Sequence, residues 1–160
     1  MTKLKTYVFF ILTALATGGL SALLTRNNMD IYSDIKTPPL APPSILFSIV
    51  WTLLFILMGV SAAIIYSTPT SPFNERKSAL YTYIASLFFN FWWSIIFFNS
   101  RSFLFAFIWL LVLLFLIFKT IIRYVKISPL AAYLQIPYLL WVAFAGYLNF
   151  GIWLLNSSNQ

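Results

Sequence analysis

The sequence predicts an all-α integral membrane protein, built as a single bundle of five transmembrane helices. Of its 160 residues, 61% are hydrophobic and only 8% are charged, which is far from the composition of soluble domains. Five apolar runs each approach the roughly 20 residues that a helix needs to cross a bilayer. Short polar or proline-containing stretches separate these runs, as connections between helices do.

We expect a single domain whose five helices cover residues 7–24, 44–66, 79–98, 103–122 and 130–155. A proline-rich outer loop at 25–43 connects the first helix to the second. A signal peptide is the alternative for the first run, but apolar residues continue beyond its small-residue pattern, which favours a retained helix. Gly18 and Gly19 in this run indicate a face for close helix packing.

The later boundaries follow from turn and capping residues. The pairs Pro38–Pro39 and Pro42–Pro43 predict a stiff, non-helical segment, with Ser44 as the expected N-cap of the second helix. Ser128 before Pro129 predicts the start of the last helix, and Pro137 predicts a kink within it.

Basic residues divide unequally between the two sides of the predicted bundle. One side collects seven of them, and the other has only three: Arg26, Lys36 and Arg101. The positive-inside rule therefore places the N-terminus in the cytoplasm, with the proline-rich loop and the C-terminus outside. We expect a multi-pass protein of a bacterial cell membrane. Because the cations are scattered between apolar runs, nucleic acid is not an expected partner.

The residue types that are missing limit the chemistry. The chain has no cysteine and no histidine, so thiol catalysis and the usual metal and haem ligands are excluded, and no metal site is expected. Its carboxylates, Asp30, Asp34 and Glu75, all lie outside the apolar runs. An acid–base pair inside the bundle is therefore not expected either.

Polar and aromatic residues recur at helical spacing inside three of the runs. They are Ser48, Trp51 and Phe55 in the second, Ser86, Asn90, Trp93 and Ser94 in the third, and Tyr138, Trp141, Ala145 and Asn149 in the fifth. Asn90 is open to two readings, an interhelical hydrogen bond or an amide that faces a ligand. Together these side chains suit a flat, apolar or aromatic molecule with few polar atoms.

Several separate motifs, in order, resemble one known family. The run Pro38–Pro39–Leu40–Ala41–Pro42–Pro43 is followed by Trp51–Thr52 and Met58–Gly59. Later runs are Asn90 with Trp93, Ser128–Pro129–Leu130–Ala131–Ala132, Pro137–Tyr138, Trp141, and Leu148–Asn149. Over about 31–156 the chain is similar to the TspO/MBR family, that of the translocator proteins or peripheral benzodiazepine receptors.

The resemblance implies a five-helix membrane receptor, commonly homodimeric, that binds porphyrins such as protoporphyrin IX and isoquinoline carboxamide or benzodiazepine-type ligands. The resemblance implies no required cofactor, and porphyrin is the expected ligand or substrate. By motif position, the resemblance implies that Tyr32, Pro42, Trp51, Asn90, Trp93, Trp141, Ala145 and Asn149 line or approach the pocket. The helical spacing described above adds Ser48, Phe55 and Tyr138 to the expected ligand-binding residues. Some members are reported to degrade protoporphyrin in light; Trp51 and Trp141 hold the tryptophan positions implicated there as photochemical, catalytic residues.

The chain departs from the family pattern at three places. Ile31 and Leu40 replace tryptophans that are often found in the outer loop, and no basic residue follows Tyr147, so we expect poor cholesterol recognition. Two other functions stay open. One is a transporter of tetrapyrroles or other small hydrophobic molecules, and the other is a structural membrane protein whose aromatics only fill space.

Overall fold

The computed structural model describes residues 2–157, and this part of the chain contains helices and connecting loops but no strand. The elements are α1 (Lys3–Thr25), the 3₁₀ turn η1 (Arg26–Asn28), α2 (Ile31–Asp34), α3 (Ser44–Ser67), α4 (Phe73–Ser94) with its π-helical continuation η2 (Ile95–Asn99), α5 (Phe103–Ile127) and α6 (Pro129–Asn156). Five of the helices are long and apolar enough to cross a membrane in the described part. The predicted fold class is confirmed.

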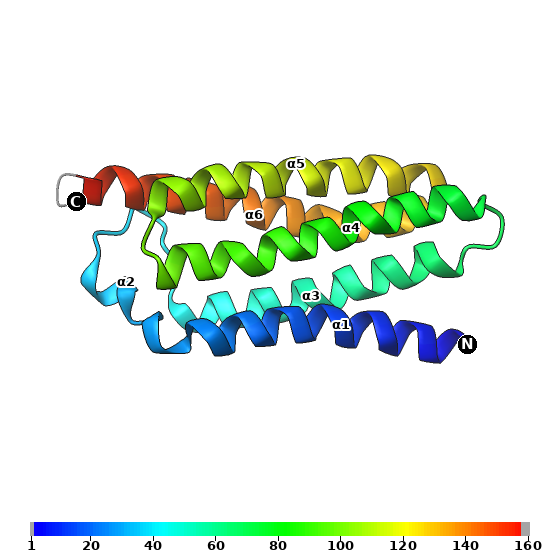
Figure 1. The fold of residues 1–160 in the computed structure, drawn as a ribbon, viewed down its shortest axis with the longest axis horizontal. Coiled ribbons are helices and arrows are strands. Elements are labelled where there is room, and N and C mark those ends of the chain that lie inside the picture. Colours follow the sequence, from blue (N-terminus) through cyan, green and yellow to red (C-terminus); the bar gives the residue numbers. More distant parts are fainter. Residues whose placement is uncertain (1, 158–160) are drawn as a thin grey trace.

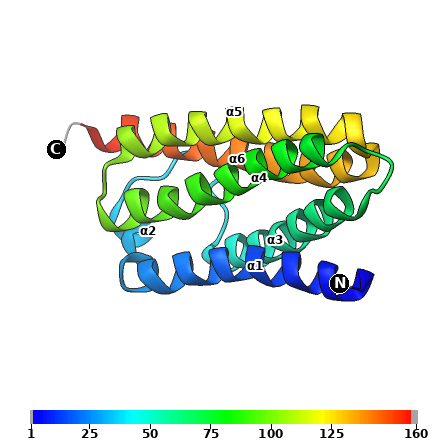
Figure 2. The same cartoon turned by 45° about the vertical axis from the view of Figure 1, so that its right-hand side comes forward.

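The long helices run side by side in one elongated bundle (Figure 1). Both views place α1 and α3 on one side, α5 and α6 on the other, and α4 between them (Figures 1 and 2). The start of α1 and the end of α6 lie at opposite ends of the bundle, as an odd number of spans requires. The short α2 and the proline-rich loop cover the end of the bundle at which α1 finishes.

The observed helices are longer than the apolar runs that predicted them. α1 begins at Lys3, α4 at Phe73 and α5 ends at Ile127, so each extends past the apolar run into charged sequence. Helical hydrogen bonding does not stop where the hydrocarbon stops, because long basic side chains reach the interface from such ends. α6 continues through Pro137 as one helix.

One prediction about the outer loop was wrong. Ser44 is the first residue of α3 and not its N-cap; that position belongs to the extended Pro43, and no side chain caps the helix. The loop is partly helical, since α2 forms one turn at Ile31–Asp34. The proline pairs themselves lie outside any helix, as the fixed φ of proline predicts.

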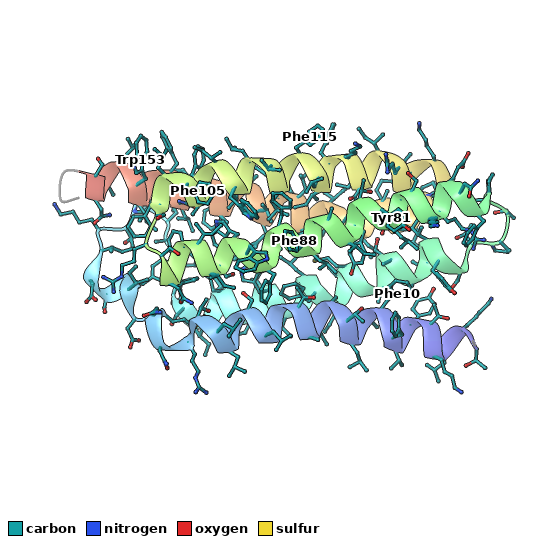
Figure 3. The ribbon with its side chains drawn as sticks, viewed as in Figure 1. Phe10, Tyr81, Phe88, Phe105, Phe115 and Trp153 are labelled. Atoms are coloured by element: carbon teal, nitrogen blue, oxygen red, sulfur yellow. The ribbon has the colours of Figure 1, made fainter. Side chains whose placement is uncertain are left out.

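The outer surface of the bundle is apolar. Phe88, Phe105 and Phe115 project from α4 and α5 (Figure 3), and 53–60% of each residue's surface is exposed. Burying such a surface requires a bilayer as the solvent. The chain is therefore an integral, multi-pass membrane protein.

Close contacts fix the end of the bundle that lies far from the proline-rich loop. At Gly59 the α3 backbone approaches α1 so closely that a Cβ would overlap the Ile11 backbone. The Ser61 hydroxyl donates to the carbonyl of Ala131 (2.7 Å) and accepts from Nε2 of Gln135 (3.2 Å), which joins α3 to α6. At this end the helices leave little room between them.

Candidate functional site

A hollow of about 1150 Å³ lies between α1, α3 and α4 in the half of the bundle nearest the proline-rich loop. Side chains from α1, the loop, α3 and α4 form its wall. Several of them, including Gly19, Ser44, Ser48 and Thr52, are exposed, so the hollow is open on the side where α1 and α3 face each other.

Aromatic rings form most of the inner wall. The rings of Trp51 and Phe55 lie 5.7 Å apart on α3, and Trp93 on α4 is only 4% exposed. Phe98 follows in the π-helical turn η2, which changes the helical register just beyond Trp93. Such surfaces favour stacking with a flat ring system.

Hydrogen bonds from α6 hold two of these wall residues from behind. Asn90 donates through Nδ2 to the Tyr138 hydroxyl (2.9 Å), and Trp93 donates through Nε1 to Oδ1 of Asn149 (3.1 Å). Asn149 in turn donates through Nδ2 to the carbonyl of Phe103 (2.8 Å). The Asn90 amide therefore makes the interhelical hydrogen bond of the first reading, and the residue also lines the hollow.

The proline-rich loop closes the hollow and is tied to α6. The backbone N–H and C=O of Lys36 pair with the side-chain amide of Asn156 at 3.1 and 2.9 Å. The Tyr147 hydroxyl donates to the carbonyl of Pro39 (3.0 Å), and Pro38 packs so closely on Gly151 that a Cβ there would overlap its ring. This loop segment is a lid with fixed anchors.

Two loop residues stand out within the lid. Tyr32 packs among Phe47, Phe97 and Phe98 at ring-centroid distances of 5.9–6.2 Å, and this burial raises the pKa of its phenol to about 12. Leu40 has φ of 69°, a left-handed conformation that is uncommon for a leucine, and its side chain is exposed. The lid thus holds one aromatic inward and one apolar side chain outward.

The structure brings together seven of the eleven residues expected at the site. The residues that line the hollow are Tyr32, Pro42, Ser48, Trp51, Phe55, Asn90 and Trp93. The other four belong to α6 and lie outside this lining. Tyr138 and Asn149 stand behind the wall as hydrogen-bond partners, and Ala145 is buried in the core.

Trp141, the fourth α6 residue, is separated from the hollow by a single ring. Phe47 lines the hollow and packs edge-on against Trp141, with 5.4 Å between the ring centroids. The Trp141 indole N–H is buried and meets no acceptor among residues 2–157. A ligand could reach this donor only after Phe47 had moved.

Sequence reasoning missed the contribution of the first helix. Leu15, Gly18, Ser21 and Ala22 all line the hollow, as do Phe47 and Phe98. The signal was the run of small residues at 18–22, which was interpreted only as a helix-packing face. Gly18 does serve that role, since a Cβ there would overlap the Phe55 ring, whereas Gly19 has open space beside it.

Comparison with known proteins decides the family. The family model described as TspO/MBR matches residues 9–154. The chain belongs to the TspO/MBR family. It is 37% identical over 125 residues to the Tryptophan-rich protein TspO of Chlorobaculum tepidum, covering 78% of each chain. It is also 33% identical over 148 residues to the protein of the same name from Archaeoglobus fulgidus, covering 92% of this chain and 94% of that one.

Membership extends to eukaryotic relatives. The translocator protein of Ovis aries is 31% identical over 129 residues, which cover 81% of this chain and 76% of the sheep protein. With the five apolar helices, this family membership supports a membrane binding or transport role.

Proposed function

We propose that the chain is a membrane receptor that binds a flat tetrapyrrole such as protoporphyrin IX, and also isoquinoline carboxamide or benzodiazepine-type ligands, in the hollow between α1, α3 and α4. The observation that supports this proposal most is the volume of the hollow together with its aromatic lining. Small-molecule pockets range from roughly 300 to 1,000 Å³, and a hollow of about 1150 Å³ with Trp51, Phe55 and Trp93 on one wall has room for a ring system of that class.

Binding of this kind rests on apolar burial and stacking, with neutral hydrogen-bonding groups at the rim. Ser33, Thr37 and Ser44 supply hydroxyls there, while Asp30 is an acidic residue of the lining. A ligand's carboxylates are therefore expected to lie beside Thr37 and Ser44, away from Asp30 and the Ser33 hydroxyl that is hydrogen-bonded to its carbonyl. Metal-free porphyrin is expected to bind at least as well as haem, because the chain offers neither histidine nor cysteine as an axial ligand.

Protoporphyrin IX titrated in the dark, with quenching of tryptophan fluorescence as the readout, tests this proposal. Trp51→Phe should weaken affinity about tenfold, in line with the loss of a buried aromatic anchor. Trp92→Phe is the matched control, since Trp92 lies on the same bundle with 40% of its surface exposed and does not line the hollow. Equal affinities for the two variants would refute the assignment of the hollow.

Light-dependent degradation of the porphyrin is the finer part of the proposal. If Trp51 takes part in the photochemistry, Trp51→Phe should slow the loss of porphyrin absorbance at saturating ligand, where weaker binding no longer matters. Trp141→Phe should have a smaller effect, because Phe47 separates Trp141 from the hollow. Unchanged rates in both variants under saturation would exclude these tryptophans from the chemistry, and no light-dependent loss in the wild type would leave a receptor without it.

Transport of tetrapyrroles or other small hydrophobic molecules is the second candidate. The open side of the hollow between α1 and α3 favours it, because a ligand could enter there from the bilayer. The close contact of Gly59 with the Ile11 backbone, together with fully buried Met58 and Ala62, opposes a continuous path. Porphyrin flux across proteoliposomes separates transport from binding alone.

We also propose that the protein is a homodimer with its N-terminus in the cytoplasm. The unequal charge of the two ends supports this orientation, since Lys3, Lys5 and Lys126 lie at the end opposite the lid. Light scattering in detergent measures the assembly state, and labelling of single cysteines placed in the lid measures the orientation.

A further inference from the structure

A second hollow, of about 370 Å³, lies at the opposite end of the bundle from the first, where α3 ends and α4 begins. Its residues come from the last turn of α3 and the first turns of α4: Tyr66, Phe73, Arg76, Lys77, Leu80, Tyr81 and Ile84. None of them lines the first hollow. We call this second hollow the inner groove.

Two positive charges occupy the polar end of the inner groove. The Arg76 guanidinium donates to the carbonyl of Tyr66 (2.7 Å) and lies 6.0 Å from the centroid of the Phe73 ring. Nζ of Lys77 lies 5.7 Å from the centroid of the Tyr81 ring. Carbonyl and ring contacts position both cations without neutralising them.

No carboxylate among residues 2–157 pairs with these two cations. Glu75 is the nearest acid in sequence, and it accepts a hydrogen bond from the Ser71 hydroxyl (3.4 Å). Asp30 and Asp34 belong to the other end of the bundle. In addition, Nε of Arg76 is buried and has no acceptor in the described chain. Within the described residues, no acidic side chain therefore balances the two positive charges at the polar end of the groove.

The other end of the groove continues as an apolar strip on the outer surface of α4. Tyr81, Ile84 and Phe88 are 59%, 55% and 53% exposed, and their spacing places them on one side of the helix. Figure 3 shows Tyr81 and Phe88 following one another along α4. From Lys77 to Phe88 the helix rises about 16 Å, close to the depth of hydrocarbon in one leaflet, which is roughly 15 Å.

We propose that the inner groove binds an anionic phospholipid from the leaflet that adjoins the α3–α4 connection. Its phosphate lies between Arg76 and Lys77, and one acyl chain follows Tyr81, Ile84 and Phe88. A free anion would use the cations but leave the strip uncovered, and a zwitterionic lipid would leave the net charge unpaired. Basic clusters at the ends of membrane helices attract anionic headgroups for the same electrostatic reason. This site does not depend on the porphyrin proposal.

Lipid association measured with spin-labelled phosphatidylglycerol, in phosphatidylcholine bilayers that contain the full chain, tests the proposal. Wild type should bind this probe more tightly than spin-labelled phosphatidylcholine. Lys77→Gln should reduce that preference about fivefold, the effect of one basic residue near a membrane surface. The double variant Arg76→Gln/Lys77→Gln should abolish the preference.

Lys119→Gln is the matched control for Lys77→Gln. Lys119 is an exposed lysine near the same end of the bundle, and its Nζ lies 5.9 Å from the centroid of the Phe115 ring, but it does not line the groove. This variant should keep the lipid preference within about twofold, since it removes the same charge elsewhere. Equal losses in the two variants would overturn the site in favour of general surface charge.

A fallback variant and one further measurement make the outcome decisive. Arg76 also holds the Tyr66 carbonyl, so the single variant Lys77→Gln carries the test if the double variant fails to fold. Millimolar inorganic phosphate should leave the lipid preference unchanged. Displacement of the lipid probe by phosphate would show an anion site in place of a lipid site and would overturn the proposal.

Discussion

The two sides of the bundle differ in how the space between their helices is used. Between α5 and α6, and where α4 meets them, the interior is filled: small residues such as Ala106 and Ala145 pack there beside the fully buried Tyr124 and Tyr138. Between α1, α3 and α4, in the half near the lid, large aromatic rings surround a hollow. Both sides are equally apolar in sequence, so composition alone does not decide which side stays open.

Hydrogen bonding from the filled side explains the difference. Asn149 and Tyr138 on α6 hold Trp93 and Asn90 of α4, so these wall residues do not collapse toward α1. The filled side therefore acts as a scaffold that holds the wall residues of the hollow in place. Variants that disturb the scaffold, the hollow or the lid should therefore have different consequences. We expect the largest effect from the scaffold, a smaller one from the hollow and the smallest from the lid.

Asn149→Leu should have the largest effect. The change leaves Nε1 of Trp93 and the carbonyl of Phe103 without their buried partners, and each orphaned group costs about 1–3 kcal/mol. We expect a loss of roughly 3 kcal/mol in the free energy of unfolding, measured by denaturant titration in detergent micelles, together with weaker ligand binding. Phe150→Leu, at the neighbouring exposed position, is the control and should change stability little. A stable Asn149→Leu protein would refute the scaffold interpretation.

Gly18→Ala should act on the hollow itself. The added methyl group would overlap the Phe55 ring, which must then shift, at a cost of about 1–3 kcal/mol for overpacking. We also expect porphyrin affinity to fall several-fold, as measured by fluorescence titration. Gly19→Ala tests the same change one residue away, where a Cβ meets nothing within 4 Å, and should not lower the stability. Similar behaviour of the two variants would show that the contact with Phe55 does not matter.

Tyr32 should give the smallest effect, confined to high pH. Its pKa is raised from 10.0 to about 12 by burial, so the folded lid holds this proton more tightly than the unfolded chain does. The stability that it contributes is fully present below pH 10 and is lost as the pH rises toward 12. Thermal stability of the wild type should therefore fall more steeply over this interval than that of Tyr32→Phe. Parallel pH profiles would indicate an exposed phenol.

The five spans could be predicted because membrane helices depend on composition and length, which are properties of the sequence itself. Their ends could not, since α4 begins within the polar run at Phe73 and α1 at Lys3, where hydropathy is no guide to helix formation. The Ser128–Pro129 boundary was predicted correctly, with Ser128 in the N-cap position before α6, because the fixed φ of proline favours the first helical turn.

Residues of the site could be predicted where a polar or large aromatic side chain interrupts an apolar helix. Asn90 and Trp51 stand out in apolar helices and line the hollow. Tyr138 and Asn149 stand out in the same way but lie behind the wall, because the rotation of α6 against α4 is a tertiary property. The place of Gly18 in the lining was missed for the opposite reason, since a residue without a side chain predicts close packing of helices but no contact with a ligand.

The anchoring of the lid has a consequence for biosynthesis. The lid ends at Pro43, but the groups that hold it, Tyr147, Gly151 and Asn156, are on α6, the last helix among residues 2–157 to be made. During translation the lid is therefore present for most of the chain's synthesis without its tethers. The binding site is completed only when α6 enters the membrane, so a ribosome that stalls before this helix leaves a chain with four spans and an unanchored lid.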